Sequence, residues 1–290
     1  MRAKFYGVRG SVPAPGPSTA RYGGNTSCVC VELSDESLLI LDAGTGLREL
    51  GNALLSRDKI PPLHLVLSHT HWDHILGLPF FAPLWSQGTQ LRIYPLGNPD
   101  QERFQHNIFD DIHFPVAFDA IPSHVEFIRP VGPVWRVGSA HLHRIALNHP
   151  GGAQGFRVND DDGTSVAYLT DNELSRPDTT SVDELARFAE GVDLLIHDSQ
   201  YLPSDMPEKD GWGHSVVDDV LELGIKAAPK VLALYHHDPD RSDAQLDAIG
   251  EEAEQHLAGR DGTIRSVVAH EGLEIDLQNG SSSHKKGSAG

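Results

Sequence analysis

The sequence predicts a layered α/β protein, and three observations support this fold class. Short apolar segments rich in Val, Ile, Leu and Tyr recur along the chain and are separated by Gly, Pro, Asn and Asp. Segments with helical patterns lie between these predicted strands, which favours helices packed on sheets. One predicted strand, at 63–68, ends in a cluster of histidine and aspartate residues. Functional sites of α/β proteins usually lie just beyond the ends of strands.

The predicted elements are short and follow one another closely. Segments with the composition of strands are 4–8, 27–33, 37–44, 63–68, 90–96, 124–130, 141–147, 155–160, 165–171, 193–199, 231–237 and 266–277. The best-marked helices are 181–191, 215–224 and 242–259, and another can begin within 72–81. The helices at 181–191 and 242–259 open with a Ser-x-x-Glu and a Ser-x-x-Gln capping box, and each ends at a glycine.

Composition limits the classes of function. The 290 residues are 39% hydrophobic and 22% charged, which is ordinary for a globular protein. We expect a cytoplasmic protein without a membrane partner, because the chain has neither a signal-peptide pattern nor an apolar run long enough to cross a bilayer. The net charge of -18 disfavours extended nucleic acid as a partner. The net charge does not exclude a small anionic substrate, because bound metal cations can dominate the electric field at a site.

The same composition bears on domains and cysteines. The length fits either two domains or one large α/β unit, and we expect residues 1–278 to form a single domain. The small, polar residues 279–290 are expected to be a disordered tail. Cys28 and Cys30 point to one face of a predicted strand, where we interpret them as two small core side chains rather than a disulfide. The sequence leaves a homodimer open.

The segment "SHTHWDH" carries the chemistry. His69, His71, Asp73 and His74 form an H-x-H-x-D-H pattern on the turn that leaves the strand at 63–68. Imidazole nitrogens and carboxylate oxygens are good ligands of first-row divalent metals. Residues this close together cannot all face one ion without strain, so the pattern favours two adjacent ions. A plain polar loop does not explain four such groups at this spacing.

Further ligands are expected at the ends of other strands. Candidates that follow apolar segments are His149, Asp171, His236 and His237. Each of these alone would be an ordinary capping or turn residue. Together with the histidine motif, they indicate that several strand ends converge on one metal site.

These motifs resemble the metallo-β-lactamase superfamily, and within it the ribonuclease Z and cyclic-nucleotide phosphodiesterase-like branch. The resemblance covers residues 4 to about 277 and rests on H-x-H-x-D-H, a distant His, a later Asp after "YLT" and a final His after a strand. The supporting segments are "ILDAGTG", "GVRGSVPAPG", "YGGNTSC", "LLIHDSQY" and "GWGHS". The resemblance implies a four-layer αββα sandwich with the site at one edge, between the two sheets.

The resemblance also implies a role for each ligand. His69, His71 and His149 would hold one divalent ion, Asp73, His74 and His236 would hold a second, and Asp171 would bridge the two. Zinc is the first expectation, with manganese or iron as alternatives. The choice of His236 over His237 follows the ending of the family strand and leaves His237 as a candidate substrate-binding residue.

Residues around the ligands receive supporting roles. Asp42 and Asp198 are candidate carboxylates that fix the ligating imidazoles. Asp73 could orient the nucleophile, a metal-bridging hydroxide, and His214 could donate a proton, although it could also be an ordinary helix-entry residue. Arg9 and Asn25, in glycine-rich turns, are candidate substrate-binding residues.

Departures from related branches narrow the expected reaction. Asp171 stands where true β-lactamases have a cysteine ligand, and His71 stands where the oxygen-reducing diiron branch has Glu. The segment 98–146, an insert that could cover the pocket, is aromatic and acidic rather than a basic, glycine-rich arm for tRNA. The chain also lacks cysteines for the extra zinc of the cyclic phosphodiesterases associated with carbon–phosphorus bond cleavage. Four phenylalanines of the insert could stack on a base or form a local core: Phe104, Phe109, Phe114 and Phe118.

The leading hypothesis is therefore a dinuclear metal-dependent phosphodiesterase that acts on a small phosphodiester such as a cyclic nucleotide or dinucleotide. The alternatives are a lactonase or thioesterase of the same fold, a tRNA 3'-processing endonuclease, and a metal-binding sensor without catalysis.

Overall fold

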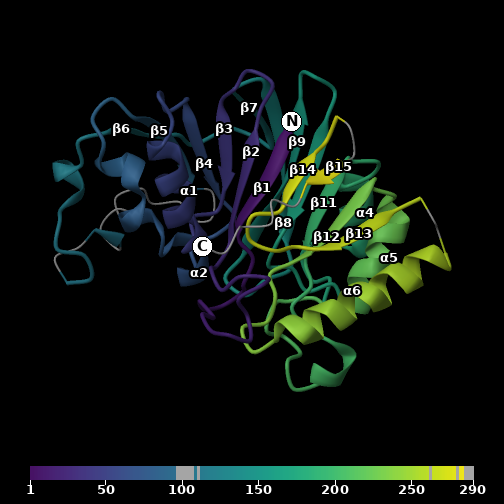
Figure 1. The fold of residues 1–290 in the computed structure, drawn as a ribbon. Helices are drawn as coiled ribbons and strands as arrows, with labels where there is room; N and C mark the ends of the chain where they lie inside the picture. Colours follow the sequence, from purple (N-terminus) through teal and green to yellow (C-terminus); the bar gives the residue numbers. More distant parts are fainter. Residues whose placement is uncertain (96–107, 110–111, 261–262, 279–280, 284–290) are drawn as a thin grey trace.

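Two β-sheets packed face to face form the centre of the molecule. The structure is a computed structural model that describes residues 1–95, 108–109, 112–260, 263–278 and 281–283. Within these ranges, one sheet has eight strands in the order β15-β14-β1-β2-β3-β4-β5-β6, and the other has seven in the order β13-β12-β11-β10-β9-β8-β7. Figure 1 shows α1 and α2 beside the first sheet and α4, α5 and α6 beside the second.

The bounds of the elements follow the sequence closely. The first sheet consists of β1 (Arg2–Gly7), β2 (Cys28–Glu32), β3 (Leu38–Leu41), β4 (Leu63–Leu67), β5 (Gln90–Pro95), β6 (His124–Phe127), β14 (Glu274–Asp276) and β15 (Ser281–Ser283). The second consists of β7 (Val134–Val137), β8 (Ala140–Leu147), β9 (Ala153–Asp160), β10 (Ser165–Leu169), β11 (Leu194–Asp198), β12 (Val231–Tyr235) and β13 (Arg265–Val268). The helices are α1 (Gly46–Leu55), α2 (Trp72–Ile75), α4 (Val182–Phe188), α5 (Val217–Ala227) and α6 (Asp243–Ala258).

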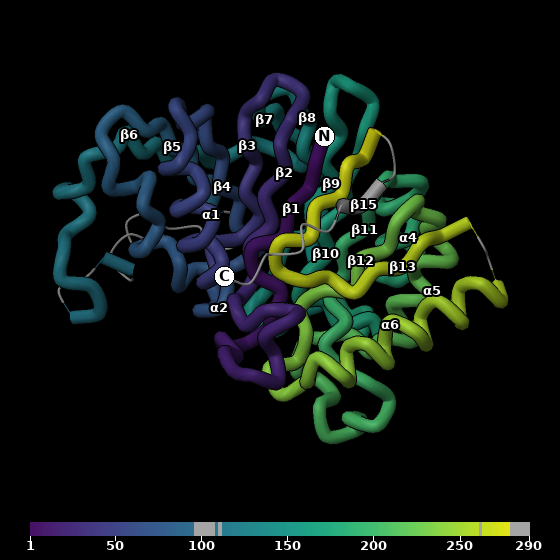
Figure 2. The backbone as a smooth tube through the Cα atoms, viewed as in Figure 1, coloured from purple at the N-terminus to yellow at the C-terminus, as the bar shows by residue number. Residues whose placement is uncertain are grey.

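Three apolar clusters define the layers. The central cluster lies between the sheets and includes Phe5 and Val29 from the first sheet and Phe156 and Tyr168 from the second. A second cluster joins the second sheet to α4, α5 and α6, and a third joins the first sheet to α1. This arrangement confirms the predicted αββα sandwich (Figure 2). Burial of all three interfaces supplies the main driving force for the fold.

Most local predictions agree with the structure. Both predicted capping boxes are present, at Ser181 with Glu184 and at Ser242 with Gln245. The two cysteines are free and buried and belong to the same apolar cluster, as expected for one face of β2. The helix within 72–81 is shorter than its pattern allows, because α2 ends at Ile75 and 3-10 turns follow at Leu78–Phe80 and Ala82–Trp85.

Several elements differ from the sequence analysis. Helix α1 was not anticipated, although its buried Leu47, Leu50 and Leu54 recur at helical spacing. Strand β7 was also missed, and the single strand expected at 266–277 is divided between two sheets, as β13 and β14. The division follows from a turn at Gly272, whose φ of 82° favours glycine.

The expected insert and tail are only partly described. Within the insert, residues 124–127, 134–137 and 140–146 belong to sheet strands, where β6 pairs with β5 and β7 pairs with β8. Residues 96–107 and 110–111 of the expected insert lie outside the described ranges, as do 279–280 and 284–290 of the expected disordered tail. Ser281–Ser283 pair antiparallel with β14, since backbone hydrogen bonding at a sheet edge does not need apolar side chains.

The parallel direction of several strands brings the predicted site residues together at one edge of the two sheets. β3 and β4 are parallel, and β10, β11 and β12 are parallel in the other sheet. The residues just beyond β3, β10 and β12 include Asp42, Asp171 and His236, whose φ angles of 64°, 59° and 59° are positive. Non-glycine residues rarely adopt this conformation, which costs about 1 to 3 kcal/mol and clusters at functional sites.

Candidate metal centre

Two groups of ligand atoms meet at the shared edge of the sheets. One group contains His69, His71, His149 and Asp171. The other contains Asp73, His74, His236 and Asp171. Within each group, the ligand atoms lie within 4.8 Å of one another. The structure therefore brings together all seven residues that the sequence analysis assigned to two ions, with the same division between them.

The first group lies partly open to solvent. His69 follows β4 and is buried, whereas His71, just before α2, is exposed. His149 follows β8, and its Nε2 lies 3.1 Å from His71 Nδ1. The rings of His69 and His149 are 4.9 Å apart. This group thus combines three imidazoles with an approach from solvent.

The second group is buried throughout. Asp73 and His74 belong to α2, and His236 follows β12. His236 Nε2 lies 3.2 Å from Asp73 Oδ2 and 3.3 Å from His74 Nε2. Asp73 Oδ2 also accepts a hydrogen bond from the backbone N–H of Ser11, at 2.8 Å. Three ligand atoms from two distant parts of the chain therefore converge on one point.

Asp171 faces both groups with different oxygens. Its Oδ1 lies 3.1 Å from His74 Nε2 and 3.2 Å from His236 Nε2. Its Oδ2 lies 3.5 Å from His69 Nε2 and 3.7 Å from His149 Nε2. A carboxylate with one oxygen toward each group has the geometry that a ligand shared by two cations requires.

The hydrogen bonds of the imidazoles show that the ring nitrogens fit a metal. His74 donates its Nδ1–H to Asp42 at 2.8 Å, His149 donates to the carbonyl of Gly213 at 2.9 Å, and His236 donates to Gln200 Oε1 at 3.0 Å. In the neutral imidazole, the opposite nitrogen then carries a lone pair. All three of these Nε2 atoms face the cluster, which is the arrangement of metal-ligating histidines.

His69 provides the clearest sign that a cation belongs here. Ser68 donates its hydroxyl to Asp42 at 2.8 Å, so it accepts from His69 Nδ1 at 3.0 Å. The Nε2 of His69 is buried and has no hydrogen-bond partner. Buried polar atoms are normally paired, and a metal ion would satisfy this one.

The surroundings shift the pKa of the ligands in different directions. Burial alone would lower the pKa of His74, but Asp171, Asp73 and Asp42 outweigh it and raise the pKa well above its usual value, so metal binding there would release a proton. Burial alone would raise the pKa of Asp171, but His236, His74 and His69 outweigh it and hold the pKa well below its usual range. Burial lowers the pKa of His69 well below its usual value, with help from His74. The carboxylate is therefore ionised and this imidazole neutral, which are the forms that bind metals.

Asp42 is the principal support of the second group. This fully buried carboxylate accepts four hydrogen bonds, from the backbone and hydroxyl of Ser68, from His74 Nδ1 and from the hydroxyl of Tyr168, at 2.7 to 2.8 Å. The predicted supporting role of Asp42 agrees with this geometry. Sequence reasoning did not anticipate Ser68 or Tyr168, although Tyr168 stands in the "YLT" segment just before the bridging aspartate.

Asp198 and His214 form a second supporting pair. Asp198 Oδ2 accepts from His214 Nδ1 at 2.7 Å, and both residues are buried. The ring of His214 stacks on that of His236 at 5.0 Å, so its remaining nitrogen belongs to the same site. Burial alone would lower the pKa of His214, but the Asp198 charge and hydrogen bond outweigh it and raise the pKa to about 9.

Gln200 is a site residue that the sequence analysis missed. Its Oε1 accepts from His236, and its Nε2 donates to the hydroxyl of Ser11 at 3.3 Å. Gln200 therefore links His236, at the end of β12, to the loop of Ser11, whose backbone N–H bonds to Asp73. The "LLIHDSQY" segment carries this residue and could have suggested it.

The structure does not support the three predicted substrate-binding residues. Arg9 is fully buried, and its guanidinium donates to the carbonyls of Gly23, Asp238 and Arg241. The Asn25 side chain donates to Glu271 at 3.1 Å. His237 is buried and its Nε2 bonds to the carbonyl of Ala269 at 2.8 Å. These contacts hold loops together and give no support for substrate binding, and His236 rather than His237 lies in the metal cluster.

The phenylalanines of the expected insert form a local core. Phe109 packs edge-on against Phe114 and Phe118, with ring centroids 5.7 and 5.5 Å apart. Phe118 in turn contacts Phe127 of β6. Phe109 and Phe118 are therefore part of a local core, against which Phe114 packs, while Phe104 lies outside the described part of the chain.

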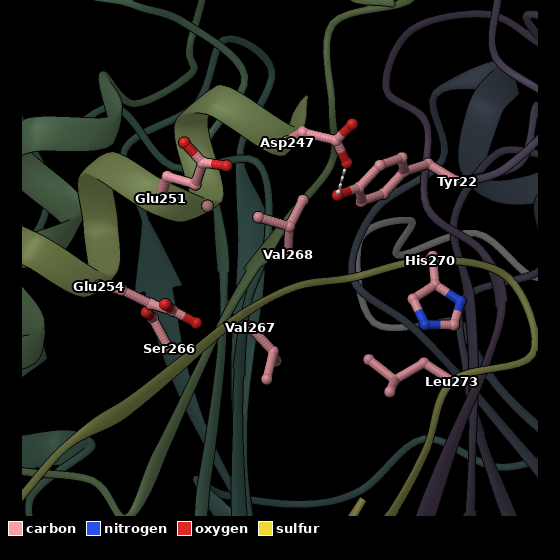
Figure 3. Close-up of a pocket in the computed structure, with 10 residues that line it drawn as sticks. Tyr22, Asp247, Glu251, Glu254, Ser266, Val267, Val268, His270 and Leu273 are labelled. Carbon is pink, nitrogen blue, oxygen red and sulfur yellow. Dashed lines mark hydrogen bonds between the residues drawn. The ribbon is translucent and has the colours of Figure 1, made fainter. Parts of the chain in front are cut away.

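Cavities occur both beside the cluster and away from it. One of about 320 Å³ includes His149, Asn148 and Arg176 in its lining and so adjoins the first group. Another, of about 440 Å³, lies beside α6, where Figure 3 shows Asp247 next to Tyr22 and Glu254 next to Ser266. None of the described residues that line this second cavity is a metal ligand, so volume alone does not identify the functional site.

The fold and the paired His/Asp groups define a metal-dependent hydrolase of the αββα class. The family model described as a beta-lactamase superfamily domain matches residues 38–237, and the chain belongs to that superfamily. Ribonuclease Z of Pyrococcus horikoshii is 24% identical over 279 residues, which cover 81% of this chain and 85% of the relative. This similarity confirms the branch that the sequence motifs indicated.

Solved structures agree on the fold. The metallo-beta-lactamase fold protein YhfI of Bacillus subtilis matches with a TM-score of 0.68 and 20% identity, over 94% of this chain and 97% of that chain. A diphosphatase of the PhnP family matches with a TM-score of 0.66 and 21% identity, over 95% of this chain and 97% of that chain. In the described part of the chain, no helix is both long and apolar enough to cross a membrane.

Proposed function

We propose that the protein is a dinuclear metal-dependent phosphodiesterase that acts on a small phosphodiester, such as a cyclic nucleotide or dinucleotide. The observation that carries the proposal is Asp171, whose two carboxylate oxygens face two separate groups of histidine and aspartate ligands. Nitrogen and oxygen ligands suit zinc first, with manganese and iron as alternatives. Relatives that are named ribonuclease Z and diphosphatase support the cleavage of phosphate esters.

The surrounding residues would divide the work of hydrolysis. Two bound divalent ions would supply an activated water and neutralise charge on the phosphate. Asp73, held by the backbone of Ser11 at 2.8 Å, is placed to orient the attacking water. His214, fixed by Asp198 at 2.7 Å, is placed to donate a proton to the leaving oxygen. Both groups are buried and hydrogen-bonded, so little reorganisation would be needed during reaction.

Charge favours a small substrate over an extended one. The chain carries a net charge of -18, and long polyanions are repelled by such a surface outside the metal site. The similarity to ribonuclease Z keeps tRNA 3'-end cleavage as the second candidate function. In that case, binding should weaken steeply with salt, because many phosphates would be contacted.

A substrate panel separates these functions. Metal-loaded protein is incubated with bis(p-nitrophenyl) phosphate, cyclic nucleotides, a dinucleotide, a precursor tRNA, a lactone and a thioester. The proposal predicts turnover of the small phosphodiesters and loss of that turnover in the presence of a chelator. Turnover of only the lactone or thioester would overturn the proposal, as would cleavage of only the tRNA. Stoichiometric metal binding without any turnover would indicate a sensor.

A further inference from the structure

An apolar groove begins at the metal motif itself. Trp72 stands between the ligands His71 and Asp73 in the sequence. Because Asp73 and His74 are buried in the cluster, the helix turns Trp72 and Leu76, four residues apart, to the outside. Trp72 is 56% exposed and Leu76 37% exposed. The outer face of α2 is therefore an apolar surface that starts beside His71, the exposed ligand.

This surface is the floor of a real cavity. We name it the Trp72 groove and define it by the residues that line a volume of about 360 Å³: Trp72, Ile75, Leu76, Pro79, Phe80, Ile108, His113 and Phe114. None of the described residues in its lining is Asp, Glu, Lys or Arg. Volumes of this size are at the lower end of ligand pockets. An uncharged cavity is unusual beside a cluster of carboxylates and histidines, on a chain with a net charge of -18.

Aromatic rings shape the groove. Phe80 is 56% exposed and meets Phe114 edge-on, with ring centroids 5.8 Å apart. Phe114 is anchored from behind by Trp85 and Phe109 at 5.9 and 5.7 Å. The ring of His113 faces Trp72 at 6.3 Å. The Phe114 wall is thus held by the local core, while more than half of the surface of Trp72 and of Phe80 stays exposed.

We propose that the Trp72 groove binds an uncharged planar ring of the substrate, a nucleobase, while the phosphate attached to it lies at the metal cluster. The inference rests on the proposed function and specifies its substrate class as nucleotide esters. Stacking on aromatic side chains accepts any base, because every base has a π face. The occupant is a single base rather than a polynucleotide, since neither lysine nor arginine is among the described residues of the lining to bind further phosphates.

The test compares two ligands that differ only by the base. Binding of AMP and of ribose 5-phosphate to the metal-loaded protein is measured by calorimetry, which does not depend on turnover. We expect AMP to bind about tenfold more tightly, in line with the contribution of one base stacked on an aromatic ring. Phe80→Ala and Trp72→Ala should remove most of this difference and leave ribose 5-phosphate unchanged, and Trp72→Phe should restore part of it.

Matched controls separate the groove from the metal site. Leu55→Ala changes another exposed apolar residue, on α1, which is 48% exposed and outside the groove, and should leave both affinities unchanged. Metal content is measured for each variant, so that any loss of ions in Trp72→Ala is detected and Phe80→Ala then decides. Turnover of bis(p-nitrophenyl) phosphate in the same preparations tests the proposed function separately.

Three results would overturn the inference. The first is equal affinity for AMP and ribose 5-phosphate in the wild-type protein. The second is a preference for octyl phosphate over AMP, which would assign the groove to an acyl chain. The third is a concentration-dependent dimer that Phe80→Ala dissociates, which would assign the groove to a second copy of the chain.

Discussion

The two halves of the metal centre differ in how they are enclosed. Asp73, His74 and His236 are all buried, whereas in the other half His71 is exposed, although the side chains of His69 and His149 are buried. The buried half joins α2 to β12 across the two sheets. The open half lies on the loops that follow β4 and β8. One group of ligands is therefore buried and the other is reached by solvent, although the two groups share Asp171.

The supporting hydrogen bonds differ in the same way. In the buried half, His74 is held by Asp42, His236 by Gln200, and Asp73 by Ser11. In the open half, His149 is held by the carbonyl of Gly213 and His69 by Ser68. His71 is the exception, since it has no carboxylate or carbonyl partner among the described residues and its Nδ1 lies 3.1 Å from His149 Nε2. Outer partners fix the orientation and basicity of ligands. We infer that the buried half holds its ion more tightly, while the open half is where substrate and solvent arrive.

Removing the shared carboxylate should have the largest effect. Asp171→Ala takes one ligand from each half, so we expect loss of both ions at micromolar metal and a fall in phosphodiester turnover of about a thousandfold or more. Metal analysis and kinetics on the same sample measure this. Asp183→Ala, an exposed carboxylate on α4, is the control and should retain both. Two ions per chain at a normal rate in Asp171→Ala would rule out the bridging role.

Asp42→Ala tests the support of the buried half. It leaves the hydrogen-bond donors of Ser68, His74 and Tyr168 unpaired in the core, which should cost about 3 kcal/mol or more of unfolding free energy. Metal affinity should fall by about 10- to 100-fold. Urea unfolding of the metal-free protein and a competitive chelator titration measure the two effects. Unchanged stability would mean that Asp42 is not the anchor that its contacts indicate.

His71→Ala tests the open half and should spare the fold. The side chain is exposed, so the free energy of unfolding of metal-free protein should change by less than about 0.5 kcal/mol. One of two ions should be lost and turnover should fall sharply. Metal analysis that still finds two tightly bound ions would remove the difference between the halves.

The smallest effect concerns acid stability away from the ligands. His64 in β4 is buried beside the hydroxyl of Tyr94, and burial lowers its pKa to about 4. The unfolded chain, with a pKa near 6.5, binds the proton more readily, so the stabilisation is complete above pH 6.5 and is lost as the pH falls toward 4. His64→Gln should reduce this loss by about 2.5 kcal/mol in metal-free protein, measured by urea unfolding at pH 7 and pH 4.5.

The metal ligands were predictable because their signal is local. The spacing of His69, His71, Asp73 and His74 on one turn, and His or Asp residues at other strand ends, depend only on the chain direction. Arg9, Asn25 and His237 show the limit of such reasoning. They were predicted to bind substrate, but their side chains form hydrogen bonds with neighbouring loops of the protein. Which way a loop side chain points depends on contacts between distant segments.

The same limit applies to the supporting residues and the insert. Gln200 gains its role only because β11 and β12 bring it beside His236. Strand β7 and helix α1 were missed, since their short apolar patterns become clear only once they pack. The αββα layering itself was predictable, because the family motifs extend along nearly the whole chain.

A stepwise metal titration tests the central claim most directly. Zinc is added to metal-free protein while bound metal and the hydrolysis of bis(p-nitrophenyl) phosphate are measured together. We expect saturation at two ions per chain, with a tighter and a weaker step, and turnover that rises mainly with the second ion. Saturation at one ion, or full turnover before the second ion binds, would contradict a site built from two halves around Asp171.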